Sequence, residues 1–183
     1  MTRTWLLTST TYGTWLPGDA RGFVSTVQAG PGPRVRHNTY GTPYDQDIPG
    51  LRRSARQRLR CPPILLTPEQ ARVVLEQFRA TARYRNWLLH AAAVMANHFH
   101  LVVSAAEEVH STALLRDFKS YAARALNRAW PRPASGTWWT ESGSRRPLPS
   151  EEAVEAAIRY VRDQVGVLAL WSAADIDQPG AGT

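Results

Sequence analysis

The sequence has almost no cysteine and no long hydrophobic run, and both shortages limit the class of protein. Cys61 is the only cysteine among 183 residues, so no disulfide can form within the chain. No run of about 20 apolar residues is present that could cross a bilayer. Because the sequence shows no signal-peptide pattern either, we expect a cytoplasmic protein with no membrane partner.

Lysine is nearly absent too, although the chain is basic. Lys119 is the only lysine among 22 basic side chains, which face 15 acidic ones and leave a net charge of +7. Such an excess indicates a polyanionic partner. Arginine forks onto phosphates and stacks on bases, which suits nucleic acid, although a genome rich in G and C produces the same bias. Composition therefore favours a nucleic-acid-binding protein.

Two histidines lie on a predicted strand that follows an alternating apolar run from Leu89 to Met95. The pattern predicts a β-hairpin with its turn at Ala96-Asn97. Side chains on a strand repeat every two residues, so His98 and His100 project from one face about 7 Å apart. Two imidazoles on one side of a rigid strand have the arrangement of metal ligands. So short a triplet also occurs by chance, and the interpretation needs a second feature.

The second feature is a predicted amphipathic helix near the C-terminus. Ser150 is a suitable N-cap, and apolar residues then recur with helical spacing as far as Val165, with Gly166 as a possible cap. On this helix Tyr160 and Gln164 are i, i+4 neighbours at the edge of the apolar stripe. A phenol beside an amide carbonyl suits a nucleophile next to a third metal ligand.

These two segments together resemble the HUH single-tyrosine transposases. The resemblance rests on the stretch from Asn97 to His100 with its Leu-Val-Val continuation, and on the stretch from Tyr160 to Gln164. It extends to residues 5–16, 118–124 and 139–145, and looks most like the branch called REP-associated tyrosine transposases. It implies a single-stranded DNA nickase and ligase that recognises hairpin DNA, associates with the nucleoid and works as a monomer or homodimer.

The order of predicted elements indicates an α+β fold. We expect a strand over residues 4–11, a helix over 67–85, the hairpin over 87–104, a helix capped by Ser111, a strand over 137–140 and the last helix. The order βαββαβ is that of the ferredoxin-like arrangement, a four-stranded antiparallel sheet with two helices on one face. The third strand is then central, so both histidines lie mid-sheet on the open face, which the additional C-terminal helix can partly cover. One domain, 1–171, would contain a long irregular insertion at about 23–66, and residues 172–183 would form a mobile tail.

Several basic and aromatic residues are candidates for contact with DNA. An arginine run in the insertion would bind phosphates, as would a loop with exposed backbone amides over 142–146, and the outer face of the second helix is basic. A solvated charge run is the alternative for the first of these. Tryptophans could stack on bases, although burial in a core is their usual place. The candidates are Arg52, Arg53, Arg56, Arg58, Arg60, Lys119, Arg124, Arg145, Arg146, Trp15, Trp138 and Trp139.

The expected chemistry is cleavage of a phosphodiester by a tyrosine. A divalent cation held by His98, His100 and Gln164 would polarise the scissile phosphate; the ligand set is compatible with Mg²⁺ or Mn²⁺, and histidines favour the latter. Attack by Tyr160 would give a 5′-phosphotyrosine and a free 3′-hydroxyl, so rejoining needs no ATP. Two alternatives stay open: a domesticated protein that binds hairpin DNA or RNA without cutting it, and a metal-dependent phosphoesterase with water as its nucleophile.

Overall fold

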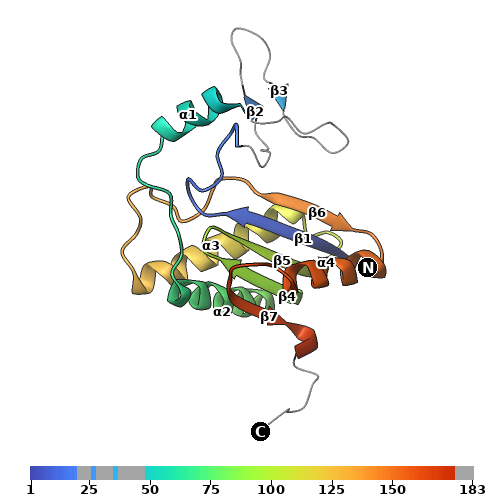
Figure 1. Ribbon diagram of the computed structural model, residues 1–183. Coiled ribbons are helices and arrows are strands. Elements are labelled where there is room, and N and C mark those ends of the chain that lie inside the picture. Colours follow the sequence, from blue (N-terminus) through green and yellow to red (C-terminus); the bar gives the residue numbers. More distant parts are fainter. Residues whose placement is uncertain (20–25, 28–34, 37–47, 176–183) are drawn as a thin grey trace.

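The computed structural model describes residues 1–19, 26–27, 35–36 and 48–175, and Figure 1 shows one large sheet with helices on both of its faces. The strands of this sheet are β1 (Thr2–Thr10), β4 (Leu88–Met95), β5 (His98–Ala106), β6 (Ser144–Leu148) and β7 (Val167–Ser172). The helices are α1 (Pro49–Gln57), α2 (Pro68–Tyr84), α3 (Ser111–Ala129) and α4 (Glu151–Arg162), and the 3₁₀ helix η1 spans Ala173–Asp175. Two short strands, β2 (Thr26–Val27) and β3 (Val35–Arg36), pair with each other.

The large sheet is antiparallel throughout, with the strand order β6-β1-β5-β4-β7. Along the chain, the elements β1, α2, β4, β5, α3 and β6 follow the predicted βαββαβ order. Strand β5 lies at the centre of the sheet between β1 and β4. The predicted α+β class is confirmed. The prediction of four strands is wrong, because β7 adds a fifth at the edge of β4.

The two faces of the sheet carry different helices. Helices α2 and α3 cover one face, and α4 covers part of the other. Helix α2 begins at a capping box, in which Thr67 Oγ1 accepts from the Gln70 backbone amide and the Gln70 side chain accepts from the Thr67 amide. Helix α3 begins after His110, whose side chain makes no capping bond, so the predicted cap at Ser111 is one residue too late.

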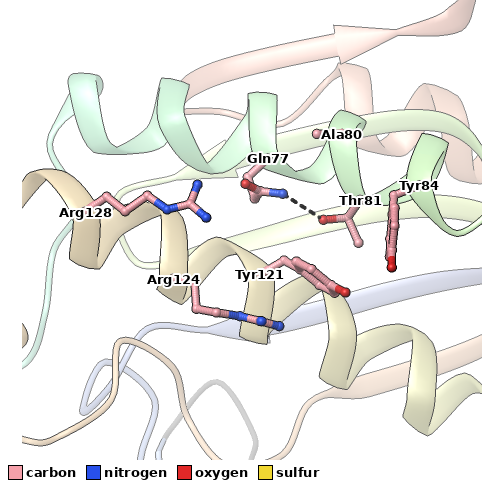
Figure 2. A pocket seen from close by; sticks show the side chains of 7 residues that line it. All are labelled: Gln77, Ala80, Thr81, Tyr84, Tyr121, Arg124 and Arg128. Atoms are coloured by element: carbon pink, nitrogen blue, oxygen red, sulfur yellow. Dashed lines mark hydrogen bonds between the residues drawn. The ribbon is translucent and has the colours of Figure 1, made fainter.

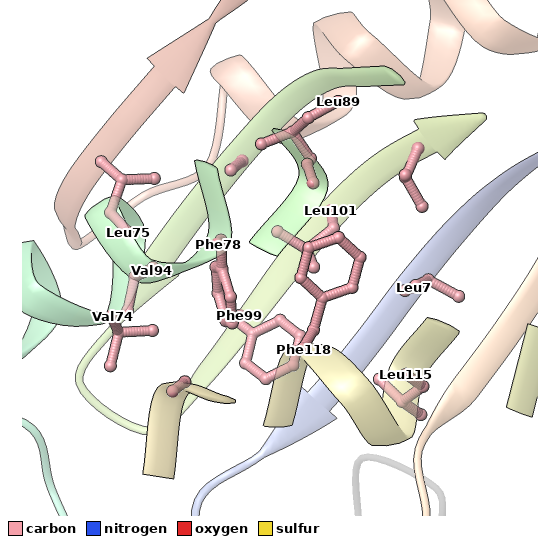
Figure 3. Packing of buried hydrophobic residues seen from close by; sticks show 14 of the residues in the cluster. Leu7, Val74, Leu75, Phe78, Leu89, Val94, Phe99, Leu101, Leu115 and Phe118 are labelled. Atoms are coloured by element: carbon pink, nitrogen blue, oxygen red, sulfur yellow. The ribbon is translucent and has the colours of Figure 1, made fainter. Parts of the chain in front are cut away.

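The main core lies between the sheet and α2 and α3 (Figure 3). Phe78 from α2 meets Phe99 from β5 with ring centroids 4.8 Å apart, and Phe118 from α3 edge-on at 5.6 Å. All three rings are fully buried. Such tilted and edge-to-face pairs add to the stabilisation from apolar burial, so this cluster fixes β5 from one side.

The fourth strand of the predicted order lies further along the chain than expected. Residues 137–140 form only an isolated bridge, Thr11 to Trp139, whereas β6 lies in the stretch that we expected to be a loop. Pro147 is tolerated in β6 because this strand is at the sheet edge, where its outer side needs no donor. The tryptophans at 138 and 139 have strand propensity, and they combine burial in the core with backbone hydrogen bonds to residues 10–12 that do not extend into a strand.

Three other expectations need correction. Helix α4 ends at Arg162, with Asp163 as its C-cap, so Gln164 and Val165 lie beyond it. The expected irregular insertion contains α1 and the β2–β3 pair. The expected tail begins too early, because Ser172 ends β7 and η1 follows it. The remainder of that tail, 176–183, lies outside the described residues.

Within the described part of the chain, no helix is both long and apolar enough to cross a membrane.

Candidate active site

His98 and His100 project from β5 toward the face that carries α4, whereas Phe99 points into the main core. The alternation of β5 therefore places the two imidazoles as predicted. Their ring centroids are 5.0 Å apart, and His98 is half-buried while His100 is only 5% exposed. The pairing of β1 with β5 and β6 puts Thr8 between His100 and Ser144 in one row across the sheet.

Each imidazole is oriented by a hydrogen bond at Nδ1. The Asn97 Oδ1 atom lies 2.6 Å from His98 Nδ1, and an amide oxygen can only accept, so His98 carries its proton on Nδ1. In that tautomer the lone pair is on Nε2, the atom that binds a metal. Thr8 Oγ1 lies 2.7 Å from His100 Nδ1 and orients that ring, with the hydroxyl able to donate or accept. Oxygen partners at the far nitrogen are typical of metal-binding histidines.

The environment of His100 favours its neutral form. Burial, followed by the charge of His98, lowers the pKa of His100 from 6.5 to about 4. The imidazole is therefore neutral at physiological pH, which is the form that can bind a metal ion.

Tyr160 reaches the same place from α4. Its ring meets the His100 ring edge-on, with centroids 5.2 Å apart, and 49% of the residue is exposed. Helix α4 is held there by Ala157 and Val161, which are buried against the sheet. Tyr160 therefore lies next to the imidazole pair and in contact with solvent, where a substrate can approach it.

Gln164 has a different position from the one predicted. It lies after the end of α4, and its Nε2 donates to the backbone carbonyl of Tyr160 over 3.0 Å. The carbonyl can only accept, so the amide nitrogen faces it and Oε1 points away. Gln164 thus satisfies one of the last carbonyls of α4. Its role as a third metal ligand stays a prediction.

The donor set at this place is small. The described residues contain no group of three or more His, Cys, Asp or Glu side chains that could hold a metal ion. Two imidazoles on one face fit a divalent cation that takes its other ligands from neutral oxygens, water or a substrate phosphate, and nitrogen ligands suit Mn²⁺ better than Mg²⁺.

The predicted DNA-binding arginines divide between two regions. Arg52, Arg53 and Arg56 belong to α1, which has no buried residue and lies outside the layers of the large sheet and its other helices (Figure 1). Arg58 caps this helix, and Arg60 follows, with its backbone amide donating to the Tyr12 hydroxyl.

Arg145 and Arg146 are neighbours on the edge strand β6. The register pairs Arg146 with Leu6, whose neighbours across the sheet lie under α4, and pairs Arg145 with Leu7 of the main core. The two side chains therefore leave opposite faces of the sheet, and only Arg146 shares the face of His100.

Other candidates are engaged in the fold. The Lys119 ammonium donates to the backbone carbonyls of Thr140, Glu141 and Ser142, and burial is the main cause that lowers its pKa to about 8. It therefore anchors the loop before β6. Trp138 and Trp139 are 5% and 3% exposed, which argues against base stacking, whereas Trp15 is half-buried. Arg124 is exposed on α3, on the far side of the sheet from the histidines.

Sequence reasoning missed Thr8 and gave Asn97 only a turn position. The sequence did contain a signal for Asn97. A side-chain oxygen directly before a histidine that is a possible metal ligand can reach the Nδ1 atom of that histidine. No signal in the sequence could find Thr8, which lies 92 residues from His100 along the chain and meets it only through the register of β1 and β5.

Comparison with known proteins decides the family. A family profile described as "Transposase IS200 like" matches residues 64–164, more than half of the chain. The chain belongs to the IS200-like transposase family. The matched part of this family member contains His98, His100, Tyr160 and Gln164 but not α1. The predicted relationship to the single-tyrosine transposases, a family of enzymes, is confirmed at the level of the family.

Two solved structures are similar to this IS200-like family member. One is a REP-associated tyrosine transposase bound to a REP hairpin, with 11% identity, a TM-score of 0.48, and coverage of 87% of this chain and 64% of that one. The chain thus spans less than two thirds of that protein. The other is a putative transposase from Deinococcus radiodurans R1, with 16% identity, a TM-score of 0.49, and coverage of 90% and 92%. A comparison with curated protein sequences finds no match.

Proposed function

We propose that the protein is a metal-dependent single-stranded DNA endonuclease and strand transferase with Tyr160 as its nucleophile. The observation that carries the proposal is the cluster of His98, His100 and Tyr160 on one face of the sheet, with the Tyr160 ring 5.2 Å from the His100 ring. The cluster lies within the part of the chain that matches the transposase family. A binding protein needs neither paired imidazoles nor an adjacent exposed phenol.

The residues divide the chemistry between them. The two imidazoles, fixed by Asn97 and Thr8, would hold the cation through Nε2, with Gln164 as the proposed third ligand. A bound Mg²⁺ or Mn²⁺ supplies charge that neutralises the scissile phosphate. Turning Gln164 toward the imidazoles would break its bond to the Tyr160 carbonyl, so ligation by Gln164 would be coupled to a change at the end of α4.

Tyr160 would carry the covalent step. Its phenolic oxygen bonds to the phosphorus while the bond from phosphorus to the 3′-oxygen breaks; the phenolic proton passes to water, and the leaving 3′-oxygen takes a proton from water. The products are a 5′-phosphotyrosine and a strand that ends in a 3′-hydroxyl. Because the phosphodiester energy is kept in the new bond, a 3′-hydroxyl of another strand can reverse the reaction without ATP.

The substrate we propose is a DNA hairpin with a single-stranded flank, of the palindromic REP type. The support is the sequence resemblance of residues 5–16, 118–124 and 139–145 to the REP-associated branch, together with the net charge of +7. Arginines of α1 and Arg146, which shares the face of the site, would contact the phosphates.

Covalent capture tests the proposal. The protein is incubated with Mn²⁺ and end-labelled single-stranded DNA that contains a REP-type hairpin, and denaturing gels then separate free DNA from protein-linked DNA. We expect an adduct whose phosphotyrosine maps to Tyr160, its complete loss in Tyr160→Phe, and its retention in Tyr121→Phe, since Tyr121 is on α3 behind the sheet. Cleavage without an adduct would support a phosphoesterase, and binding without cleavage a DNA-binding protein; either result overturns the proposal.

A further inference from the structure

A groove between α2 and α3 lies on the face of the protein opposite to α4 (Figure 2). Its volume is about 280 Å³, close to the lower end of small-ligand pockets, about 300–1,000 Å³. Its polar lining comes from Gln77, Thr81 and Tyr84 of α2 and from Tyr121, Arg124 and Arg128 of α3. The lining contains no carboxylate. The site proposed above uses none of these residues.

Two tyrosines form one end of the groove. The Tyr84 and Tyr121 rings have centroids 6.1 Å apart with an angle of 57° between their planes. Tyr84 is 74% exposed, which is unusual for a large aromatic ring, because it contributes little to the core in that position. Figure 2 shows both rings at the same end of the groove, from facing helices. They offer aromatic surface to a flat ligand.

Guanidinium groups surround the same rings. The Arg124 guanidinium lies 4.2 Å from the centre of the Tyr121 ring, and that of Arg85 lies 5.6 Å and 5.8 Å from the Tyr84 and Tyr121 rings. Arg128 lines the groove one turn further along α3. The Asp117 carboxylate, which pairs with Arg85 at 2.7 Å, is shared with Arg116 at 3.1 Å. The groove therefore attracts a ligand that is both aromatic and anionic.

We propose that this groove binds single-stranded DNA, with a base stacked on the exposed Tyr84 ring beside Tyr121 and the adjoining phosphates at Arg124 and Arg128. Stacking on tyrosine accepts any base, and arginine pairs with phosphates in bidentate geometry, so the combination suits a single strand without sequence preference. The small volume limits the occupant to a short stretch of that strand. The proposal rests on the proposed function, for which it adds a second DNA contact away from the cleavage site.

Basic residues lie on both faces at the β6 edge of the sheet. Arg146 and Arg145 of the edge strand β6 leave opposite faces, the first toward the face of His100 and the second toward the face of α3. Lys119, which anchors the loop before β6, is close to Arg145, because the charge of Arg145 contributes to lowering the pKa of Lys119. Positive charge thus continues from the cleavage face to the helix that carries Arg124.

Binding measurements test the groove. Fluorescence anisotropy with labelled oligo(dT) should show affinity reduced about 5- to 150-fold in Tyr84→Ala, since stacking on an aromatic ring contributes about 1–3 kcal/mol per base. The double variant Arg124→Gln/Arg128→Gln should lower the slope of log affinity against log salt by about 1.4, as expected for two lost phosphate contacts. Unchanged affinity and slope in these variants would overturn the proposal.

A matched control separates the groove from general charge. Arg72 is also on α2, its side chain is 64% exposed, and it pairs with Glu69 outside the groove. Arg72→Gln should leave oligo(dT) affinity nearly unchanged, and Tyr84→Phe, which keeps the ring, should bind like the wild type. An equal loss in Arg72→Gln would mean that only net charge is sensed, and would refute a built site.

Cross-linking distinguishes failure of this proposal from failure of the proposed function. Oligo(dT) substituted with 5-iododeoxyuridine is irradiated with the full-length Tyr160→Phe variant, which cannot form the covalent adduct. Cross-links that map to Tyr84 or Tyr121 support the groove even if the wild type proves unable to cleave DNA. Cross-links confined to α4 and β5 overturn it even if cleavage is confirmed, as does tighter binding of oligo(U) RNA or of an acidic peptide.

Discussion

The two faces of β5 show how one strand serves stability and chemistry at once. Toward α2 and α3 it presents Phe99, Leu101 and Val103, all with no exposed surface. Toward α4 it presents His98 and His100, each with an oxygen partner for its Nδ1. The first face stabilises through apolar burial, and the second holds polar groups that are each satisfied. The rigid core behind β5 therefore fixes the positions of the imidazoles without contacting them.

The difference depends on how much of each face the helices cover. Helices α2 and α3 together cover their face, whereas α4 buries only Ala157 and Val161 against the other. Tyr160, at the end of that contact, is 49% exposed. A half-buried residue on the α4 face, such as His98, can thus be replaced with a smaller loss of stability than a fully buried one on the core face, and the predictions below use this contrast.

The largest effect on activity is expected from the imidazoles. His98→Ala or His100→Ala should abolish cleavage, because two nitrogen ligands are the minimum on this face for holding a divalent cation. The circular dichroism spectrum and oligonucleotide binding should be nearly those of the wild type. Cleavage assays with Mn²⁺ provide the measurement, and normal cleavage by either variant in the presence of chelator would show that the ligand assignment is wrong.

The largest effect on stability is expected at Phe99, which lies between the two histidines on β5. Phe99→Ala should lower the free energy of unfolding by about 3–5 kcal/mol, since it removes a fully buried ring from the cluster with Phe78 and Trp139. Urea denaturation measures the change, with His98→Ala as the matched control on the same strand. A larger loss in the His98 variant than in the Phe99 variant would contradict the contrast between the two faces.

A smaller effect should appear when the pH falls in the absence of metal. The pKa of His100 is about 4 in the folded protein and lies near its ordinary value of 6.5 in the unfolded chain. Between these two pH values the unfolded chain binds a proton at His100 that the folded protein excludes. The contribution of neutral His100 to folding stability is therefore fully present above pH 6.5 and is lost as the pH falls toward 4. The difference corresponds to at most about 3 kcal/mol. Urea denaturation with chelator across this range should show the loss in the wild type and a smaller one in His100→Asn.

The smallest effect concerns the oxygen behind His100. Thr8→Val keeps the shape of the side chain but removes the partner of Nδ1, and should weaken Mn²⁺ binding about 10- to 100-fold. Isothermal titration with Mn²⁺ measures the affinity, and Thr8→Ser, which keeps the hydroxyl, should restore most of it. Thr4→Val is a control on the same strand and face, because Thr4 bonds to Ser104 rather than to a proposed ligand. Equal losses in Thr8→Val and Thr4→Val would show that Thr8 does not position His100.

Local patterns were sufficient for elements whose partners are close in sequence. The hairpin of β4 and β5 with its turn at Ala96-Asn97, the capping box of α2 and the start of α4 at Ser150 agree with prediction. Each depends on a period of apolar residues or on a bond that spans three or four positions. Short segments with no such signal were missed: β7 is a run of only six residues, mostly apolar without alternation, and α1 begins with Pro49 and Gly50.

The sequence by itself determined that His98 and His100 share one face of a strand and that Tyr160 lies on an amphipathic helix. Strand and helix periods are properties of the local backbone. Only the tertiary structure decided that Thr8 is the oxygen partner of His100 and where β6 joins the edge of the sheet. Those outcomes depend on the register between β1 and β5 and on competition between strand pairing and burial for residues 137–148. Both are set by contacts between residues far apart in the chain, which no local pattern encodes.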